Sequence, residues 1–175
     1  MVHKDYESLP VVFEDVAIHR ATIVLKSGPV TFTVNFTYIG KRFEVSEGGS
    51  IVCTGCMYFP DETEKKSLSL CFQESDAKTL SLNSNDIYKE LKLRGYEYGP
   101  NFQGIIGSDM EGSKGLLKWI GEWVVFLDAV LQFSVLSIQE KDLALPTRIE
   151  KLLIDPIVHK TSIKKSLKKY GGKCY

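Results

Sequence analysis

The sequence has no surplus of charge of either sign, and no apolar run long enough to cross a membrane. Lysine and arginine total 22, and aspartate and glutamate total 22, so the formal net charge is zero. Sequence-independent nucleic-acid binding depends on excess positive charge, which argues against a nucleic-acid partner. A membrane span needs roughly 20 apolar residues and a secretory signal needs an apolar segment, and the sequence has neither. We expect a cytoplasmic protein without a membrane span.

Cysteine is also scarce, and the strand-like setting of the cysteines argues against a metal or redox centre. The four cysteines are Cys53, Cys56, Cys71 and Cys174. The first two have the CxxC spacing of redox and zinc sites, but they lie in a strand-like run, residues 51–59. Residues three apart on a strand point to opposite faces, and no second cysteine pair or histidine pair completes a site. We expect reduced thiols in a sheet and no metal.

What is present is the composition of an ordinary globular protein, with a first half rich in strand patterns. Hydrophobic residues make up 43% and charged residues 25% of the 175 residues, which is normal usage. Residues 30–38 alternate apolar and polar side chains, as a half-buried strand does. Residues 46–50 hold two glycines between two further strands, which predicts a hairpin. Residues 10–59 are therefore predicted to form an antiparallel sheet with one apolar face, and this half offers no helix to cover it.

The middle of the chain changes character and predicts a boundary. Residues 60–66 have the pattern of a charged turn. Residues 75–86 are polar and rich in serine and asparagine, which predicts a linker between a first domain, residues 1–74, and a second, residues 87–175.

Three further segments carry weaker signals. A short helix is predicted after residues 84–86, which can cap it, with Gly95 as its stop. The loop at residues 95–104 carries three large aromatics, which either anchor a turn or line a site. The lysines after residue 159 form a solvated strand face or tail, or else dock an acidic partner.

Residues 124–138 form the most informative segment, because they are apolar on nearly every side over fifteen residues. This length without a glycine, proline or asparagine favours a buried helix. Asp128 and Gln132 are four apart and therefore share a face of that helix. A buried carboxylate is costly without a partner, and an uncharged carboxyl is the form that a general acid needs. The alternative is a structural aspartate bonded to backbone amides or to a tyrosine.

Other catalytic patterns are missing. The sequence contains no GxGxxG after a strand and no GxxxxGK[ST], HExxH or GxSxG motif. Its three histidines, His3, His19 and His159, lie in a polar terminus, in a predicted strand and near a turn. None of these settings is typical of a catalytic base.

The chain resembles the dehydratase region of animal type I fatty acid synthase over nearly its whole length. The most specific part of the resemblance is a YGPxFQ turn, Tyr98 to Gln103, followed by a DxxxQ helix. The other matching segments, in chain order, are residues 10–16, 19–22, 43–46, 88–91, 95–104, 127–132, 145–148 and 154–156, together with Trp119 and Trp123.

The resemblance implies an α+β double hotdog fold, in which antiparallel sheets each wrap around a buried helix. It implies dehydration of a β-hydroxyacyl thioester, carried on the phosphopantetheine of acyl carrier protein, to the trans-2-enoyl thioester in fatty acid biosynthesis. Asp128 matches the family's proton donor and Gln132 its accompanying polar residue. Tyr98 is a candidate substrate-binding residue, since its hydroxyl can reach the Asp128 face, or its ring can simply pack. Dehydration itself needs no cofactor, and NADPH belongs to the reductases of the multifunctional parent enzyme.

The sequence departs from this family in one respect: the HxxxGxxxxP motif, which carries the catalytic histidine, is missing. We therefore expect a partial double hotdog that holds half the active site: an N-terminal hotdog without its central helix, and a C-terminal hotdog without its last strands. On its own, such a chain is expected to be inactive. Two alternatives stay open. One is a polyketide synthase dehydratase, although these usually carry histidine at the position of Gln132. The other is a non-catalytic acyl-binding or structural hotdog.

Overall fold

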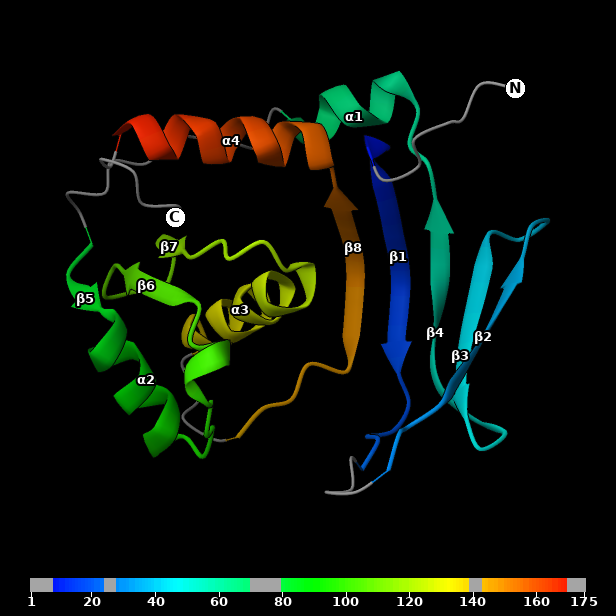
Figure 1. Cartoon of the computed structure of the whole chain (residues 1–175), viewed down its shortest axis with the longest axis horizontal. Helices are drawn as coiled ribbons and strands as arrows, with labels where there is room; N and C mark the ends of the chain where they lie inside the picture. The colour runs from blue at the N-terminus through cyan, green and yellow to red at the C-terminus, as the bar shows by residue number, and fades with distance from the viewer. Residues whose placement is uncertain (1–7, 24–27, 70–79, 139–142, 170–175) are drawn as a thin grey trace. The chain divides into compact units, whose positions relative to one another are not determined.

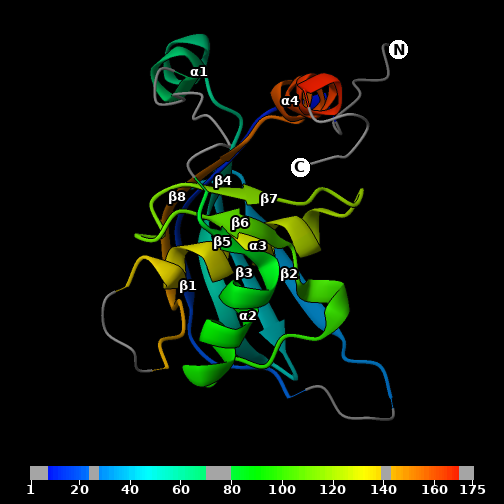
Figure 2. The same cartoon turned by 90° about the vertical axis from the view of Figure 1, so that its left-hand side faces the viewer.

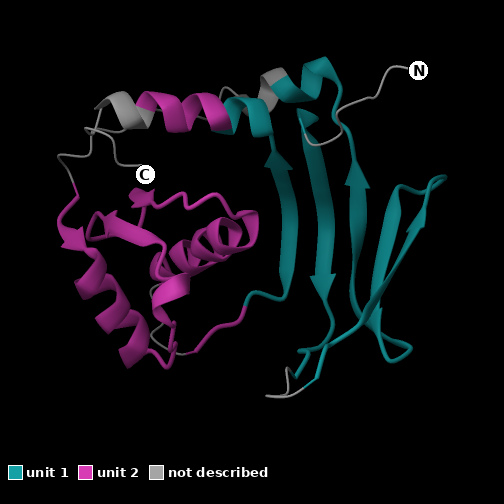
Figure 3. Cartoon of the chain, in the orientation of Figure 1, with its two compact units in different colours: residues 1–72, 146–159 teal, residues 73–145, 160–175 magenta. Residues whose placement is uncertain are grey.

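A computed structural model of the protein describes residues 8–23, 28–69, 80–138 and 143–169, which divide into two units. Unit 1 contains residues 1–72 and 146–159, and unit 2 contains residues 73–145 and 160–175 (Figure 3). Each unit has its own sheet.

Unit 1 is built on a five-stranded antiparallel sheet with the strand order β2-β3-β4-β1-β8 (Figure 1). Its strands are β1 (Val11–Ile18), β2 (Phe32–Thr37), β3 (Arg42–Glu47), β4 (Ser50–Tyr58) and β8 (Arg148–Ile154). The predicted hairpin joins β3 to β4, with Gly48 and Gly49 at φ 55° and 81°. Residues with a Cβ atom rarely adopt this left-handed backbone conformation, which explains why glycine occupies both positions. The predicted antiparallel sheet is confirmed.

Strand β1 runs through the charged pair Glu14 and Asp15 without a break. The ladder with β4 shifts register between Glu14 and Ala17, and Asp15 has a positive φ of 50°. A β-bulge inserts an extra residue and interrupts the alternation of side chains without ending the strand.

The apolar face predicted for residues 30–38 exists, but it is not half-buried. Phe32, Val34 and Phe36 are 46%, 64% and 39% exposed. Strand β2 lies at the edge of the sheet, whereas the buried residues of this sheet, Val12 and Val52 among them, lie on β1 and β4.

Two helices correct predictions made from the sequence. Helix α1 (Glu62–Ser69) replaces the expected charged turn, and Asp61 Oδ1 caps it by accepting from Glu64 N at 2.8 Å. Helix α4 (Pro156–Lys169) replaces the expected strand face or tail of lysines. Asp155 Oδ1 accepts from the first free amides of α4, and proline follows at the first helical position, which is a favourable start for a helix. Lys173 lies outside the described residues.

The division of the chain differs from the predicted one at β8. The sequence-based boundary assigned residues 87–175 to the second domain, but β8 pairs with β1 in unit 1 from Val11–Ile154 to Ala17–Arg148. Strand partners so far apart in sequence leave no local pattern, so a linker rich in polar residues was the only available signal. Residues 75–79 of that linker lie outside the described residues, and within the rest Leu82–Asn83 form the short strand β5.

Unit 2 combines a three-stranded antiparallel sheet with helices (Figures 1 and 2). The sheet has the order β5-β6-β7, with β6 at Ile105–Ser108 and β7 at Gly115–Leu117. The helices are α2 (Ser84–Leu93), the 3₁₀ turn η3 (Pro100–Phe102) and α3 (Trp123–Leu136). The predicted short helix is therefore confirmed, and Asn83 rather than a residue of 84–86 caps it, accepting from Asp86 N.

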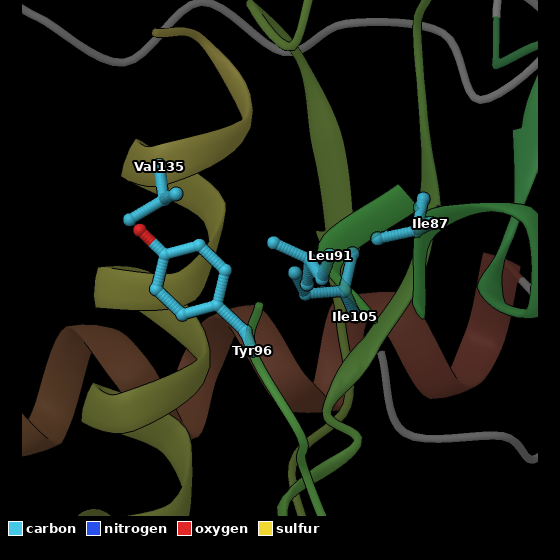
Figure 4. Close-up of a cluster of buried hydrophobic side chains, with 5 residues drawn as sticks. All are labelled: Ile87, Leu91, Tyr96, Ile105 and Val135. Carbon is cyan, nitrogen blue, oxygen red and sulfur yellow. The ribbon is translucent and has the colours of Figure 1, made fainter. Parts of the chain in front are cut away.

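The core of unit 2 lies where α2, β6 and α3 meet. Figure 4 shows Tyr96 pointing toward Val135 of α3, with Ile87 and Leu91 of α2 beside Ile105 of β6. The approach of α3 is close, because a Cβ added to Gly104 would lie 2.7 Å from the Cβ of Ala129. Burial of each large apolar side chain contributes about 1.5–3 kcal/mol, so this cluster fixes α3 against the sheet.

The helix predicted at residues 124–138 is confirmed, but it is not buried on every side. Ala129, Gln132 and Val135 are buried, at the three-residue spacing of one helical stripe, whereas Val124 is 72% exposed. Of the helices within the described ranges, none has both the length and the apolar character that crossing a membrane requires.

Candidate active site

Helix α3 places Asp128 and Gln132 one turn apart, and their side chains touch. Gln132 Nε2 donates to Asp128 Oδ2 at 2.6 Å. The predicted pairing on one helical face is therefore confirmed. The sequence predicted a buried carboxyl, but Asp128 is only half-buried, at the border of the buried stripe. Gln132 is the buried member of the pair, with 1% of its surface exposed.

The amide of Gln132 uses both of its ends. Besides the bond to Asp128, Nε2 donates to the carbonyl oxygen of Phe102 at 2.9 Å. Its oxygen, Oε1, accepts from the hydroxyl of Tyr88 at 2.8 Å. A buried amide with three bonds has a defined orientation, so Gln132 links α2, η3 and α3 at the position of the carboxyl.

The YGPxFQ turn supplies the Phe102 carbonyl. Gly99 O accepts from Phe102 N at 2.9 Å to close the turn, and Gln103 Nε2 donates to Tyr98 O at 2.9 Å. Pro100 begins the 3₁₀ turn, where its fixed φ suits the first helical position. This motif therefore fixes a backbone acceptor for Gln132.

Tyr98 lies near Asp128, as the sequence analysis expected, but its hydroxyl does not bond to the pair. Burial raises the pKa of Tyr98, and the charge of Asp128 raises it further. The ring stacks on the ring of Tyr96, with 6.2 Å between the ring centroids, and meets the ring of Tyr88 edge-on, with 6.3 Å between the centroids. Among the described residues, no hydrogen bond to the Tyr98 hydroxyl is found. Its packing is therefore visible, while its substrate contact stays a prediction.

Tyr88 is the residue that sequence reasoning missed. It lies on the short helix predicted after residues 84–86, and its hydroxyl also accepts from Ile105 N at 3.0 Å. Burial raises the pKa of Tyr88, and the charge of Asp128 adds to the rise, so the hydroxyl keeps its proton near neutral pH. An amphipathic tyrosine on the buried face of a helix was the available signal, since such a hydroxyl usually finds a partner.

The three histidines do not belong to the segment that forms the carboxyl site. His3 lies outside the described residues, and His19 bonds to Thr54 Oγ1 at 2.8 Å on the surface of unit 1. His159 lies on α4, where burial lowers its pKa. Residues 80–138, which form the carboxyl site, contain no histidine. Within the described residues of this segment, the site therefore offers the Asp128 carboxyl for proton transfer, held by the donating amide of Gln132.

The cysteines of the CxxC pair, Cys53 and Cys56, are free thiols on β4, and burial raises the pKa of Cys53. Over the described part of the chain, no group of three or more metal-binding side chains comes together. Cys71 and Cys174 lie outside the described residues.

Comparison with solved structures identifies the fold. No protein-family model matches the chain. The dehydratase domain from the CurF module of curacin polyketide synthase aligns over 81% of this chain with 22% identity and a TM-score of 0.59. GphF dehydratase 1 aligns over 88% with 13% identity and a TM-score of 0.66. The dehydratase domain of RzxB from Pseudomonas fluorescens aligns over 83% with 13% identity and a TM-score of 0.54.

These similarities show that the chain has the α+β hotdog fold of dehydratase domains, with antiparallel sheets and a central helix. The predicted fold class is thereby confirmed. The chain spans 59%, 61% and 60% of the lengths of these three structures.

Proposed function

We propose that this chain is part of a dehydratase that removes water from a β-hydroxyacyl thioester and gives the trans-2-enoyl thioester. The observation that carries the proposal is the Asp128–Gln132 pair, bonded at 2.6 Å on the helix of a hotdog fold. A single half-buried carboxyl held by a buried amide is suited to transferring one proton. The substrate is the acyl group carried on the phosphopantetheine of acyl carrier protein, and the dehydration needs no further cofactor.

In the proposed reaction, Asp128 is the general acid. A base removes the proton on Cα, the electron pair forms the Cα–Cβ double bond, and the Cβ–O bond breaks. Asp128 gives its proton to the departing hydroxyl, which leaves as water, and the carboxylate formed stays bonded to Gln132. The base is the histidine of the HxxxGxxxxP motif that the resemblance implies. No histidine of this chain matches that motif, so we propose that the isolated chain is inactive.

Within this function, we propose a cytosolic multifunctional fatty acid synthase as the parent enzyme, whose other domains are further partners. The support is the YGPxFQ turn with a DxxxQ helix, which resembles the animal fatty acid synthase dehydratase. Polyketide synthase is the second candidate, and the solved structures of that class favour it. Gln132 argues the other way, because the polyketide enzymes usually carry histidine there.

The replacement Asp128→Asn tests the role of the carboxyl. In the full-length protein that contains this chain, an amide keeps the shape of the side chain but has no acidic proton to give. General acid catalysis typically contributes about 10²–10⁴ in rate, so dehydration of a β-hydroxyacyl thioester should slow by about that factor.

Ser134→Ala is the matched control for this variant. Ser134 lies on the exposed side of the same helix, and its hydroxyl donates to the carbonyl oxygen of Leu131. The control should dehydrate at the wild-type rate and melt at the same temperature as Asp128→Asn. Wild-type turnover by a folded Asp128→Asn enzyme would leave only the non-catalytic acyl-binding or structural role.

A further inference from the structure

We propose that Tyr88 is a positioning residue whose hydroxyl sets the orientation of the Gln132 amide and thereby makes Oδ1 the proton-bearing oxygen of Asp128. This inference deepens the proposed function and rests on it for its catalytic consequence. The hydrogen-bond chain itself runs from Ile105 N through Tyr88 and Gln132 to Asp128, and it can be tested without any activity.

The direction of the chain begins at a backbone amide that can only donate. Ile105 N–H, on the fully buried residue that opens β6, points at the Tyr88 oxygen at 3.0 Å. A tyrosine hydroxyl has one proton, and with its acceptor side used, that proton must go to another acceptor. Gln132 Oε1 lies at 2.8 Å and Phe102 O at 3.5 Å, so the Gln132 oxygen is the better partner.

The orientation of Gln132 then follows from what surrounds its two ends. With Oε1 toward Tyr88, Nε2 faces two acceptors, Phe102 O and Asp128 Oδ2, and supplies a proton to each. Rotation of the amide by half a turn would bring Oε1 against those same two acceptors. Because Gln132 is 1% exposed, water could not relieve that repulsion.

The last step assigns the acidic proton. Asp128 Oδ2 accepts an N–H from Gln132 at 2.6 Å, so this oxygen is the unprotonated one when the carboxyl is neutral. The proton then sits on Oδ1. Within the described part of the chain, no hydrogen bond to Oδ1 is found, which leaves that oxygen for a departing hydroxyl. The hydroxyl of Tyr88 therefore acts on the reacting atom through Gln132 and does not touch it.

Tyr88→Phe tests the hydroxyl while keeping the ring, and Tyr96→Phe is its matched control. Tyr96 is buried in unit 2, and its hydroxyl bonds to the backbone of Ala144 rather than to Gln132. Both variants lose a hydrogen-bonded hydroxyl and should melt at lower temperature. In the full-length protein, kcat for dehydration should fall about tenfold or more in Tyr88→Phe with little change in KM, because small misplacements of a catalytic group are costly. Tyr96→Phe should keep its kcat.

A double variant asks whether Tyr88 acts through Gln132. In the Gln132→Leu background the amide is gone, so adding Tyr88→Phe should not lower kcat further. A further drop of the same size as in the wild-type background would overturn the proposal. Equal kcat values for Tyr88→Phe and Tyr96→Phe would overturn it as well.

Proton exchange of the Gln132 side-chain NH₂, followed by NMR, separates this proposal from the proposed function. Wild type and Tyr96→Phe should show slow exchange, and Tyr88→Phe fast exchange. If Asp128→Asn stays active while these exchange rates behave as stated, the proposed function fails and the hydrogen-bond chain stands. Fast exchange in the wild-type protein overturns the chain directly, even if Tyr88→Phe does not fold.

Discussion

The hydroxyl of Tyr98 lies in the field of Asp128 and is not used by the protein's own described hydrogen bonds. We propose that it binds the substrate, and Tyr98→Phe tests this in the full-length protein. One neutral hydrogen bond is worth about 0.5–1.5 kcal/mol, so kcat/KM for dehydration should fall by a factor of about 2 to 13. The melting temperature should stay the same, because the ring still stacks on Tyr96.

The effect of Tyr98→Phe should also be independent of pH around neutrality. Burial and the Asp128 charge raise the pKa of Tyr98, so its hydroxyl is protonated throughout that range. Kinetics of wild type and variant at several pH values check this. If kcat/KM of Tyr98→Phe equals that of the wild type at every pH, the tyrosine serves packing alone.

At this scale the sequence predicted pairs that are close in sequence and missed those that are distant. Asp128 and Gln132 are four apart, so helical geometry alone brings them to one face, and the 2.6 Å bond confirms it. Tyr88 reaches Gln132 across 44 positions, and only the packing of α2 against α3 creates that contact. The half-burial of Asp128 was likewise not predictable, because it depends on which stripe of the helix meets the sheet.

Among the elements, α1 illustrates a helix held by polar contacts. Tyr58 on β4 donates to Glu64 Oε1 at 2.9 Å, and Lys151 on β8 forms an ion pair with the same oxygen. Lys151 Nζ also lies 3.6 Å from Oε1 of Glu14 on β1. One glutamate therefore ties α1 to two strands of the unit 1 sheet.

This anchor should weaken in acid. The bond from Lys151 lowers the pKa of Glu64 below its ordinary value of 4.5, and the bond from Tyr58 adds to the effect. A lowered folded-state pKa means that the stabilisation is present above about pH 4.5 and is lost as the pH falls through the folded value. Lys151 stays charged over this window, because its own pKa is raised.

Thermal melts of wild type and Glu64→Gln at several pH values check this prediction. Wild type should melt at the higher temperature at neutral pH, and the difference should shrink in acid. The effect should be small, since the ion pair is exposed to solvent. A difference that stays constant from neutral to acidic pH would show that the charge of Glu64 does not hold α1.

Elements marked by turn glycines or by a long apolar run were predictable, and those held by polar groups were not. The two glycines predicted the β3–β4 hairpin, and fifteen residues without a glycine, proline or asparagine predicted helix α3. Helix α1 is short and polar, so its pattern could not be told from a turn. The lysine pattern of α4 does not distinguish a helix from a strand face or a tail. The helix-start signal of this segment is Asp155 followed by Pro156.

For the whole molecule, the division into units depends on a strand pairing that the sequence does not reveal. The unit 1 sheet takes its last strand, β8, from beyond the whole of residues 73–145. No local signal marks such a return, because pairing across more than a hundred residues depends on the complete fold. Apolar side chains of β2 stay exposed in this unit, where β2 is an edge strand of the sheet.

The central claim, that Asp128 donates the proton to the leaving hydroxyl, is tested most directly on the carrier-bound substrate. Acyl carrier protein loaded with a β-hydroxyacyl group is incubated with the full-length Asp128→Asn enzyme, and the acyl group is weighed by mass spectrometry. The account predicts that the β-hydroxyacyl group persists with this variant, while wild type and Ser134→Ala convert it to a product lighter by one water. Formation of the enoyl product by Asp128→Asn at the wild-type rate would contradict it.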